Sequence, residues 1–391
     1  MKKLGEDERP RYRWAILFAS FYAFVAFAFA FQTAPPLIPS IKGEFNILLD
    51  AEAALLMSIV LVPGIFLSLP AGLFVERYGV RRVGFTFLVC IVLGCFVTAT
   101  ANSFIMVLAG RLILGLGGSF IIPTAPAIIA QWFTREELGK AMGIYGIGMP
   151  LATVVAFPSA SVSMLAYDWR FPFYISLAVG ITAATVFVVI AKEGPFAEHK
   201  RKAGARQALG NFEIWKVGLV WLFFNAAALS FTTWAPELFE TYKGMPKVHA
   251  NFLASLLMWA AIFCVPIYGW MSDRTGRRKL FAIVGSFLMT WAFVASAYTS
   301  DLALVASILI LGVTAAMVPS IASALPAEIL GPSLASVGFS ITGICLNLGA
   351  ALAQPLVGFL LDVTKSYVFC LLGMAVLSAV GAIVAYALKT D

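Results

Sequence analysis

Two charged strings could do chemistry in this chain, because each places an acidic residue beside several arginines. They are GLFVERYGVRR at residues 72–82 and GWMSDRTGRRK at residues 269–279. Glycines permit tight turns, arginines can bind lipid headgroups, and an acid can face the positive amino-terminal end of a helix. The key residues are Gly72, Glu76, Arg77, Gly79, Arg81 and Arg82 in the first string and Gly269, Asp273, Arg274, Gly276, Arg277 and Arg278 in the second. The pattern predicts a contact between helices; arginines that only fix membrane topology are the alternative.

Residues suited to catalysis or metal binding are scarce. The two histidines, His199 and His249, lie in a polar segment and at the edge of an apolar one. No apolar stretch pairs a nucleophile with a base. Five cysteines lie in apolar stretches at spacings that match no metal site, and they are Cys90, Cys95, Cys264, Cys345 and Cys370. We therefore expect no enzyme, no metal and no other cofactor.

The composition indicates an integral membrane protein. The chain is 61% hydrophobic and 12% charged, and its mean hydropathy is +0.92. About 20 apolar residues in a helix cross the ~30 Å hydrocarbon layer. Twelve such spans are predicted, at 14–34, 51–75, 82–101, 103–132, 138–162, 171–191, 213–235, 249–271, 280–299, 301–325, 333–361 and 367–388. The expected fold class is all-α and multi-pass.

Basic residues predict the orientation of these spans. Most of the 27 Lys and Arg residues fall in segments on one side, which is typical of the cytoplasmic face. Both termini are therefore expected in the cytoplasm and the protein in the plasma (inner) membrane. Anionic headgroups at that face explain the net charge of +7, so no nucleic-acid partner is expected. The first span lacks a small-residue cleavage site and is expected to be retained.

The chain also repeats itself beyond the two charged strings. LILG at residues 112–115 returns at 309–312, and FQTAPPL from Phe31 is echoed by FTTWAPEL from Phe231. An even number of spans separates the copies, so both have the same membrane orientation. The repeat predicts an amino-terminal six-helix half at 1–191, a central cytoplasmic loop at 192–212 and a carboxyl-terminal half at 213–391.

These features resemble the major facilitator superfamily, through the repeated G-x-x-x-[D/E]-R-x-G-x-R-[RK] string and twelve spans arranged as six plus six. LAGRLILGLGGS in the fourth span and DWRFPFY before the sixth agree with it, whereas GIYGIGMPLATVVAF meets the family's antiporter motif only in part. The direction of transport therefore stays open. The resemblance implies two pseudo-symmetric halves that rock about a midplane site. It makes the charged strings cytoplasmic gates, with Glu76 facing GPSLAS and Asp273 facing the fifth span, where Thr134 to Glu137 are arranged like a capping box.

The resemblance also places a solute cavity between the halves, lined mainly by spans one, four, seven and ten. Polar residues within spans are the candidates for a substrate or ion pathway, and they are Arg111, Asn225, Gln32, Thr232, Asn347 and Gln354. An interhelical hydrogen bond is the alternative for Asn225. Gln32 and Thr232 could instead satisfy backbone groups that nearby prolines leave free.

Arg111 is the one charge expected near the midplane, where it would cost at least ~2.5–3.5 kcal/mol. Its counterpart in the second half is Ile308. We expect Arg111 to attract an anion, so that Arg111→Ile weakens binding and removes little stability; packing and proton coupling are alternatives. All acids fall in loops or at span ends, which disfavours a buried proton-carrying carboxylate and a cationic solute.

Together these features predict a monomeric secondary transporter of a small organic or inorganic anion, working by alternating access. An exporter of neutral or amphiphilic drugs or metabolites is the alternative. A non-transporting membrane sensor would be expected to carry a sizeable cytoplasmic domain, and the central loop is short and basic.

Overall fold

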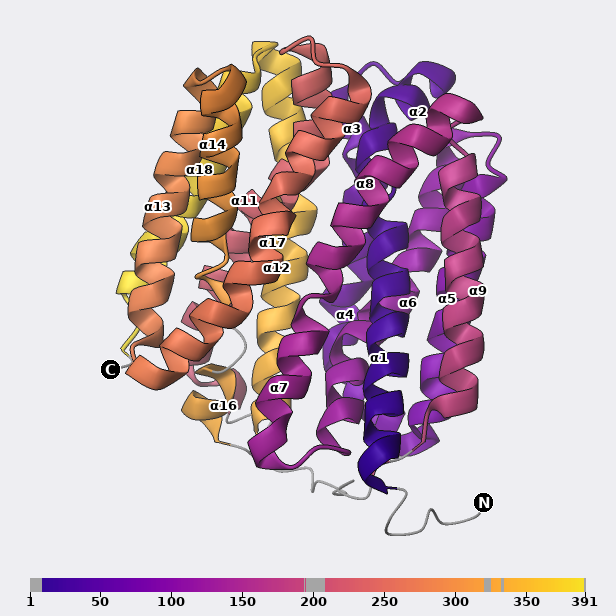
Figure 1. Cartoon of the computed structure of the whole chain (residues 1–391), viewed down its shortest axis with the longest axis vertical. Helices are drawn as coiled ribbons and strands as arrows, with labels where there is room; N and C mark the ends of the chain where they lie inside the picture. The colour runs from indigo at the N-terminus through magenta and orange to yellow at the C-terminus, as the bar shows by residue number, and fades with distance from the viewer. Residues whose placement is uncertain (1–8, 193, 195–207, 320–324, 332–333, 390–391) are drawn as a thin grey trace.

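The computed structural model describes residues 9–192, 194, 208–319, 325–331 and 334–389. All regular elements in these ranges are helices, and they stand side by side (Figure 1). Helices α1–α9 lie on one side and α11–α18 on the other; we call these groups the amino-terminal and carboxyl-terminal halves. Both termini lie at one end of the molecule, which we call the inner end, and the opposite end is the outer end.

The amino-terminal half contains α1 (Arg9–Gln32), η1 (Pro35–Leu37), α2 (Ile38–Phe45), α3 (Asp50–Ala53), α4 (Leu55–Tyr78), α5 (Val80–Ala99), α6 (Phe104–Ala130), α7 (Arg135–Gly146), α8 (Gly148–Ala166) and α9 (Phe171–Ile190). The carboxyl-terminal half contains α11 (Phe212–Thr241), α12 (Lys247–Thr275), α13 (Arg278–Tyr298), α14 (Asp301–Ala315), α16 (Leu325–Leu330), α17 (Ala335–Thr364) and α18 (Tyr367–Tyr386).

The predicted spans correspond closely to these helices. Within the described ranges, 10 helical segments are long and apolar enough to cross a membrane. Two shorter apolar helices, Leu55–Ala71 and Asp301–Ala315, occupy the places of the predicted second and tenth spans. Part of the predicted tenth span, 320–324, lies outside the described residues. The expected all-helical, multi-pass fold class is confirmed.

Three spans begin, end or break at other residues than predicted. The first helix ends at Gln32 because Pro35 and Pro36 lack N–H groups to continue it, and the chain then turns through η1 into α2. The fifth span is two helices, α7 and α8, separated at Ile147. Helix α11 runs through Pro236 to Thr241, six residues beyond the predicted end at 235. Residues expected outside the membrane thus become part of a buried helix.

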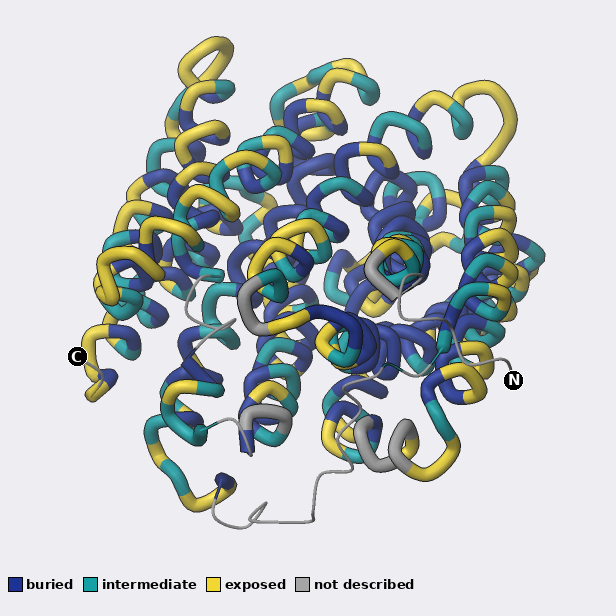
Figure 2. Tube along the Cα trace, turned by 60° about the horizontal axis from the view of Figure 1, so that its bottom comes forward, coloured by how far each residue is buried: buried dark blue, intermediate teal, exposed yellow. Residues whose placement is uncertain are grey.

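Small residues bring the helices close together. A Cβ on Gly115 of α6 would lie 2.2 Å from the carbonyl oxygen of Val60, and one on Gly94 would lie 2.5 Å from the backbone nitrogen of Leu114. Large apolar side chains such as Phe66 instead face outward. Figure 2 shows buried turns in the middle of the molecule and exposed turns around it. Such packing is typical of helices that associate within lipid.

The two charged strings share one backbone feature. Gly79, which precedes α5, has φ of 82°, and Gly276, which follows α12, has φ of 66°. Both values lie in the left-handed region, where a side chain would strain the backbone. Gly79 and Gly276 thus make the tight turns that the strings predict, whereas Gly269 lies within α12.

Candidate functional site

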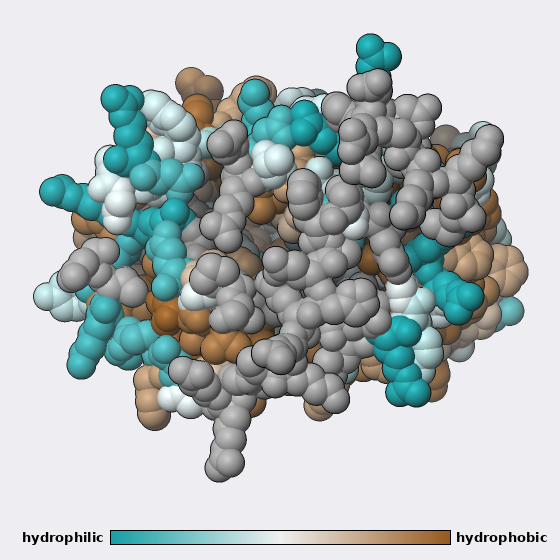
Figure 3. Space-filling model, turned by 90° about the horizontal axis from the view of Figure 1, so that it is seen from below, coloured by the Kyte–Doolittle hydropathy of each residue, from teal (hydrophilic) through white to brown (hydrophobic). Residues whose placement is uncertain are grey.

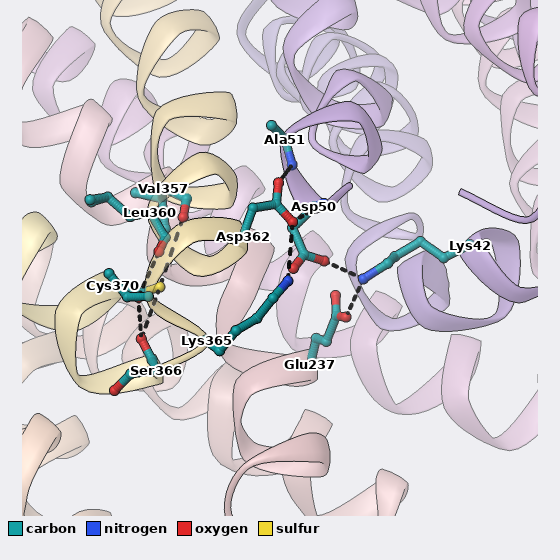
Figure 4. A network of polar contacts seen from close by, with 11 residues as sticks. Lys42, Asp50, Ala51, Glu237, Val357, Leu360, Asp362, Lys365, Ser366 and Cys370 are labelled. Carbon is teal, nitrogen blue, oxygen red and sulfur yellow. Dashed lines mark hydrogen bonds and ion pairs between the residues drawn. The ribbon is translucent and has the colours of Figure 1, made fainter. Parts of the chain in front are cut away.

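A cluster of charged residues joins the two halves at the outer end (Figure 4). Lys42 of α2 donates to Oε1 of Glu237 in α11 over 2.9 Å and also contacts the carboxylate of Asp50 at the start of α3. Glu237 is 7% exposed and Asp50 is 6% exposed. Among the residues that the structure describes, Lys42–Glu237 is the only ion pair between the halves. We call Lys42, Asp50, Glu237 and Asp362 the outer cluster.

Asp362 makes the second tie between the halves. Its two carboxylate oxygens accept hydrogen bonds from the backbone N–H groups of Asp50, over 2.8 Å, and Ala51, over 3.0 Å. A carboxylate at the amino-terminal end of a helix is stabilised by the helix dipole and by unpaired N–H groups. This is the arrangement that the sequence predicted for Glu76 and Asp273 at the inner end, and the structure places it at the outer end.

Uncharged contacts extend this closure across the outer end. Nδ2 of Asn251 in α12 donates to Oγ of Ser161 in α8 over 2.6 Å, and both residues are buried. On α17, a Cβ at Gly358 would lie 2.7 Å from the backbone of Asp50. The outer end is therefore closed by packed helices from both halves.

The inner end is different. Helix α12 packs against α8 in the outer part of the molecule, whereas α7 packs against α1, α6 and α8. A Cβ added to Gly139, Gly143 or Gly146 of α7, or to Gly269 of α12, would meet nothing within 4 Å. Seen from below, hydrophilic residues lie around the edge of this face (Figure 3). The described residues thus form a molecule that is tied together at the outer end and looser at the inner end.

The second charged string does not reach the fifth span. Asp273 pairs with Arg278 over 2.8 Å, and Arg278 pairs with Glu328 of α16 over 3.0 Å, so all three residues belong to the carboxyl-terminal half. The remaining described arginines of the two strings are exposed, and they are Arg77, Arg81, Arg82, Arg274 and Arg277. The side chains of Gly72 and Glu76, and most of GPSLAS, lie outside the described residues.

The expected capping box at the start of α7 is wrong. Thr134 makes no side-chain hydrogen bond to the backbone of the helix. Its hydroxyl instead lies 3.3 Å from Oε2 of Glu137, and the Glu137 carboxylate pairs with Arg13 of α1. The arginine competes successfully because a charge-assisted contact is stronger than a neutral one.

Arg111 is buried, with 1% exposure, and holds backbone carbonyls together. Its Nε donates to Leu56 over 2.8 Å, and its two terminal nitrogens donate to Ala30 over 2.8 Å and Phe31 over 3.0 Å. The carbonyl of Phe31 has no helical partner available, because the residue four positions later, Pro35, lacks an N–H group. The guanidinium therefore completes the hydrogen bonding of the last turn of α1.

Arg111 lies in the outer part of α6. It lies about 11 Å along α6 from the outer end at ~1.5 Å per residue, level with the end of α1 and the start of α4. The difference from Ile308 now has a structural reason. Helix α11 runs on without a break where α1 ends, so the carboxyl-terminal half needs no such donor, and Ile308 packs in an apolar core.

The other predicted pathway residues do not form one cluster. Asn225 donates to Trp221, Asn347 to Gly343 and Thr232 to Leu229, each bond lying within its own helix. Gln32 donates through Nε2 to Thr153 over 2.8 Å. Gln354 is fully buried, and its side-chain amide has no hydrogen-bond partner among the described residues.

Asn347 nevertheless marks a contact between the halves. A Cβ on Gly64 of α4 would lie 2.6 Å from Nδ2 of Asn347, so the bare glycine backbone accommodates this side chain. The structure thus places Asn347 in the packed interface of α4 and α17.

The outer cluster was not predicted, because its acids were expected in loops or at span ends. That expectation is wrong for Glu237, since α11 continues to Thr241 and buries this carboxylate. One signal could have found Glu237. In the repeat of FQTAPPL and FTTWAPEL, Glu237 stands where the first copy has Pro36. A single acid within an otherwise neutral repeated segment marks a function specific to one half.

Comparisons with known proteins place the chain in context. The model of the family described as Major Facilitator Superfamily matches residues 17–250 and 236–391. A Thermus thermophilus protein named "Probable nitrate/nitrite antiporter NarK1" is 27% identical over 302 residues, which are 74% of this chain and 66% of that protein. "Probable nitrate transporter NarT" of Staphylococcus epidermidis is 24% identical over 251 residues, 64% of each protein. The matches thus span about two thirds of these relatives.

A solved structure shares the fold. It is a bacterial homolog of the human lysosomal transporter Spinster, described as inward-facing and occupied, with a TM-score of 0.80 and 16% sequence identity. The alignment covers 97% of each chain. At this identity the likeness establishes the arrangement of helices.

Proposed function

Because the chain belongs to the major facilitator superfamily, we propose that it moves a small inorganic anion of the nitrate type across the membrane by alternating access. Family membership makes it a multi-pass membrane transporter and not an enzyme, as expected.

The charge of Arg111 is the observation that carries the anion proposal. Its hydrogen-bond partners are neutral carbonyls, and no acidic residue in the described ranges forms an ion pair with it. The positive charge is therefore uncompensated. At an effective dielectric constant of ~20, such a charge attracts an anion ~8 Å away by about 2 kcal/mol and repels a cation equally. The relatives named for nitrate and nitrite support the same class of solute.

The difference between the two ends supports alternating access. The outer end is closed by the outer cluster and by α8 against α12, whereas glycines of α7 and α12 have open space beside them at the inner end. We propose that residues 1–191 and 213–391 rock as two bodies and exchange these arrangements. The expected central loop at 192–212 lies largely outside the described residues.

The orientation is proposed from the charged strings. Both termini lie at the inner end, where the exposed arginines of the two strings also lie. Arginines at that end suit the anionic headgroups of a cytoplasmic leaflet. We therefore propose a plasma-membrane protein, active as a monomer, with both termini in the cytoplasm.

A neutral or amphiphilic solute is the second candidate, and one observation favours it. The planar fork of Arg111 is occupied by the carbonyls of α1 and α4, so it cannot grip an anion in two places. An anion would feel this charge only through its field.

Nitrate binding by variants of Arg111 separates these candidates. The measurement is the rise in thermal stability of purified protein with sodium nitrate, compared with sodium chloride at equal ionic strength, since a ligand of the folded state raises stability. We expect a rise for wild type and for Arg111→Lys, which keeps the charge, and none for Arg111→Gln. Each variant is compared with its own stability without nitrate. An equal rise in Arg111→Gln, or none in wild type, would contradict the anion proposal.

A further inference from the structure

One buried carboxylate oxygen of the outer cluster is left without a partner. Oε1 of Glu237 accepts from Lys42, whereas Oε2 is buried and accepts no hydrogen bond in the described part of the molecule. A buried carboxylate is stable as an anion only when it is paired and fully hydrogen-bonded. The charge on Glu237 therefore depends on one lysine that belongs to the other half.

We propose that Glu237 is a proton-binding site that controls the outer end: it takes a proton from the external water when the outer end opens and returns it when Lys42 comes back. This inference rests on the alternating access proposed above. In the closed form, Lys42 donates an N–H hydrogen bond to Oε1. In the open form, that bond is broken, and the proton forms an O–H bond on the carboxylate instead.

The division of the cluster between the halves singles out Glu237. Lys42 and Asp50 both belong to the amino-terminal half and stay together when the halves separate. Asp362 loses the N–H groups of α3 but keeps Lys365, 3.9 Å away on its own half. Only Glu237 loses its lysine. Opening removes the cation and the hydrogen bond that favour the charged carboxylate, so the open form binds the proton more tightly than the closed form.

The titratable groups around Glu237 belong to both halves. Asp50 on α3 leaves together with Lys42. Glu240 on α11, Tyr242 just after it, Lys247 on α12, Asp362 and Lys365 on α17, and Tyr367 on α18 stay. Of these, Glu240 favours the neutral form of Glu237 because like charges repel. Lys247 is the nearest possible substitute cation. It lies 3.9 Å from Glu240 and 3.4 Å from the hydroxyl of Ser40, and it makes no ion pair with Glu237.

Acidification should therefore open the outer end. A ligand shifts a two-state equilibrium by the ratio of its affinities for the two states, and the proton is the ligand here. Each tenfold difference in proton affinity allows up to a tenfold change in the ratio of open to closed molecules.

A cysteine at residue 161 reports opening without any solute. Ser161 is fully buried in the closed form, where it lies against Asn251 between α8 and α12. Ser161→Cys is placed in a chain whose five native cysteines are replaced by alanine. Labelling by a charged, membrane-impermeant maleimide is followed from pH 5 to 8 and divided at each pH by the rate for the same cysteine in denatured protein.

The proposal predicts that normalised labelling rises at least tenfold as the pH falls. Glu237→Gln should label quickly at every pH and lose the pH dependence, because glutamine mimics the neutral acid. Glu44→Gln is the control, since Glu44 of α2 pairs with Arg170 within its own half and not with Glu237; it should keep the wild-type profile. A flat profile in wild type, or an unchanged profile in Glu237→Gln, would overturn the proposal.

Lys42→Gln provides an independent test, including the case in which Glu237→Gln cannot be isolated. Without the competing lysine, Glu237 should take its proton at higher pH, so the midpoint of labelling should move up by at least one pH unit. An unmoved midpoint would overturn the proposal. No nitrate is present in these measurements, so their outcome is separate from the identity of the solute.

Discussion

Lys42 and Glu237 lie 2.9 Å apart, although one belongs to α2 and the other to α11, on opposite sides of the central loop. The lysine also contacts Asp50 of its own half. Separating the halves therefore breaks one ion pair and preserves the other. This asymmetry makes the contact reversible, as alternating access requires.

Asp362→Ala should shift the molecule toward an open outer end. The change removes two charge-assisted hydrogen bonds to the start of α3, and such bonds are worth ~1.5–3 kcal/mol each. We expect normalised labelling of Ser161→Cys to rise at least tenfold at pH 7.5. Lys365→Ala is the control, since Lys365 is exposed and makes only a 3.9 Å contact with Asp362. Labelling as slow as in wild type would show that the α3 contact does not hold the outer end.

Arg111→Ile should destabilise the protein, contrary to the expectation from the repeat. It leaves the carbonyls of Ala30 and Phe31 without their donor, at ~1–3 kcal/mol for each unsatisfied group. Arg111→Lys should recover part of this loss, because one ammonium can reach fewer carbonyls than the guanidinium. The measurement is thermal unfolding in detergent without added anion. A wild-type melting temperature for Arg111→Ile would mean that the carbonyls find other partners.

Gly143→Leu should block transport and leave the fold intact. Its Cβ would meet nothing within 4 Å in the present form, but the inner end must close during the cycle and bring α7 toward the other half. We expect near-normal melting and at least a tenfold loss of solute flux. Gly115→Leu is the contrasting variant, because its Cβ would meet Val60 at 2.2 Å, so it should lower stability itself. Normal flux in Gly143→Leu would place that face of α7 toward lipid.

Asp273→Asn should slow transport while insertion and abundance stay near normal. Asp273 is largely exposed and pairs with Arg278 inside one half, and exposed pairs contribute only ~0–1 kcal/mol to stability. An effect on flux would therefore reflect a contact made in another form of the molecule. Glu76→Gln tests the first string in the same way. Wild-type flux in both variants would leave the strings with a role in topology alone.

The sequence predicts the helices well because lipid imposes a simple rule on length and hydropathy. The repeated strings also predict the left-handed turns at Gly79 and Gly276, since only local backbone geometry is involved. The end of α11 was misplaced because Pro236 is a common helix terminator, yet the helix continues through it.

The polar contacts were harder to predict because they join distant segments. Sequence alone shows that Lys42 and Glu237 are charged, but their meeting depends on how two halves pack. For Arg111, the cost of burial was foreseen, and its partners were not, because the need for a donor arises from the proline break after α1. Arg111 was therefore predicted to contact the solute, whereas its hydrogen bonds are made to backbone carbonyls.

Transport of nitrate into liposomes that contain the purified protein decides whether this chain carries a small inorganic anion. Vesicles loaded with unlabelled nitrate are diluted into isotopically labelled nitrate, and uptake of label is followed with and without nitrite as competitor. We expect saturable exchange that nitrite inhibits, with loss of exchange in Gly143→Leu. Exchange no faster than in protein-free liposomes, together with movement of a neutral amphiphilic dye, would contradict the anion proposal and favour the second candidate.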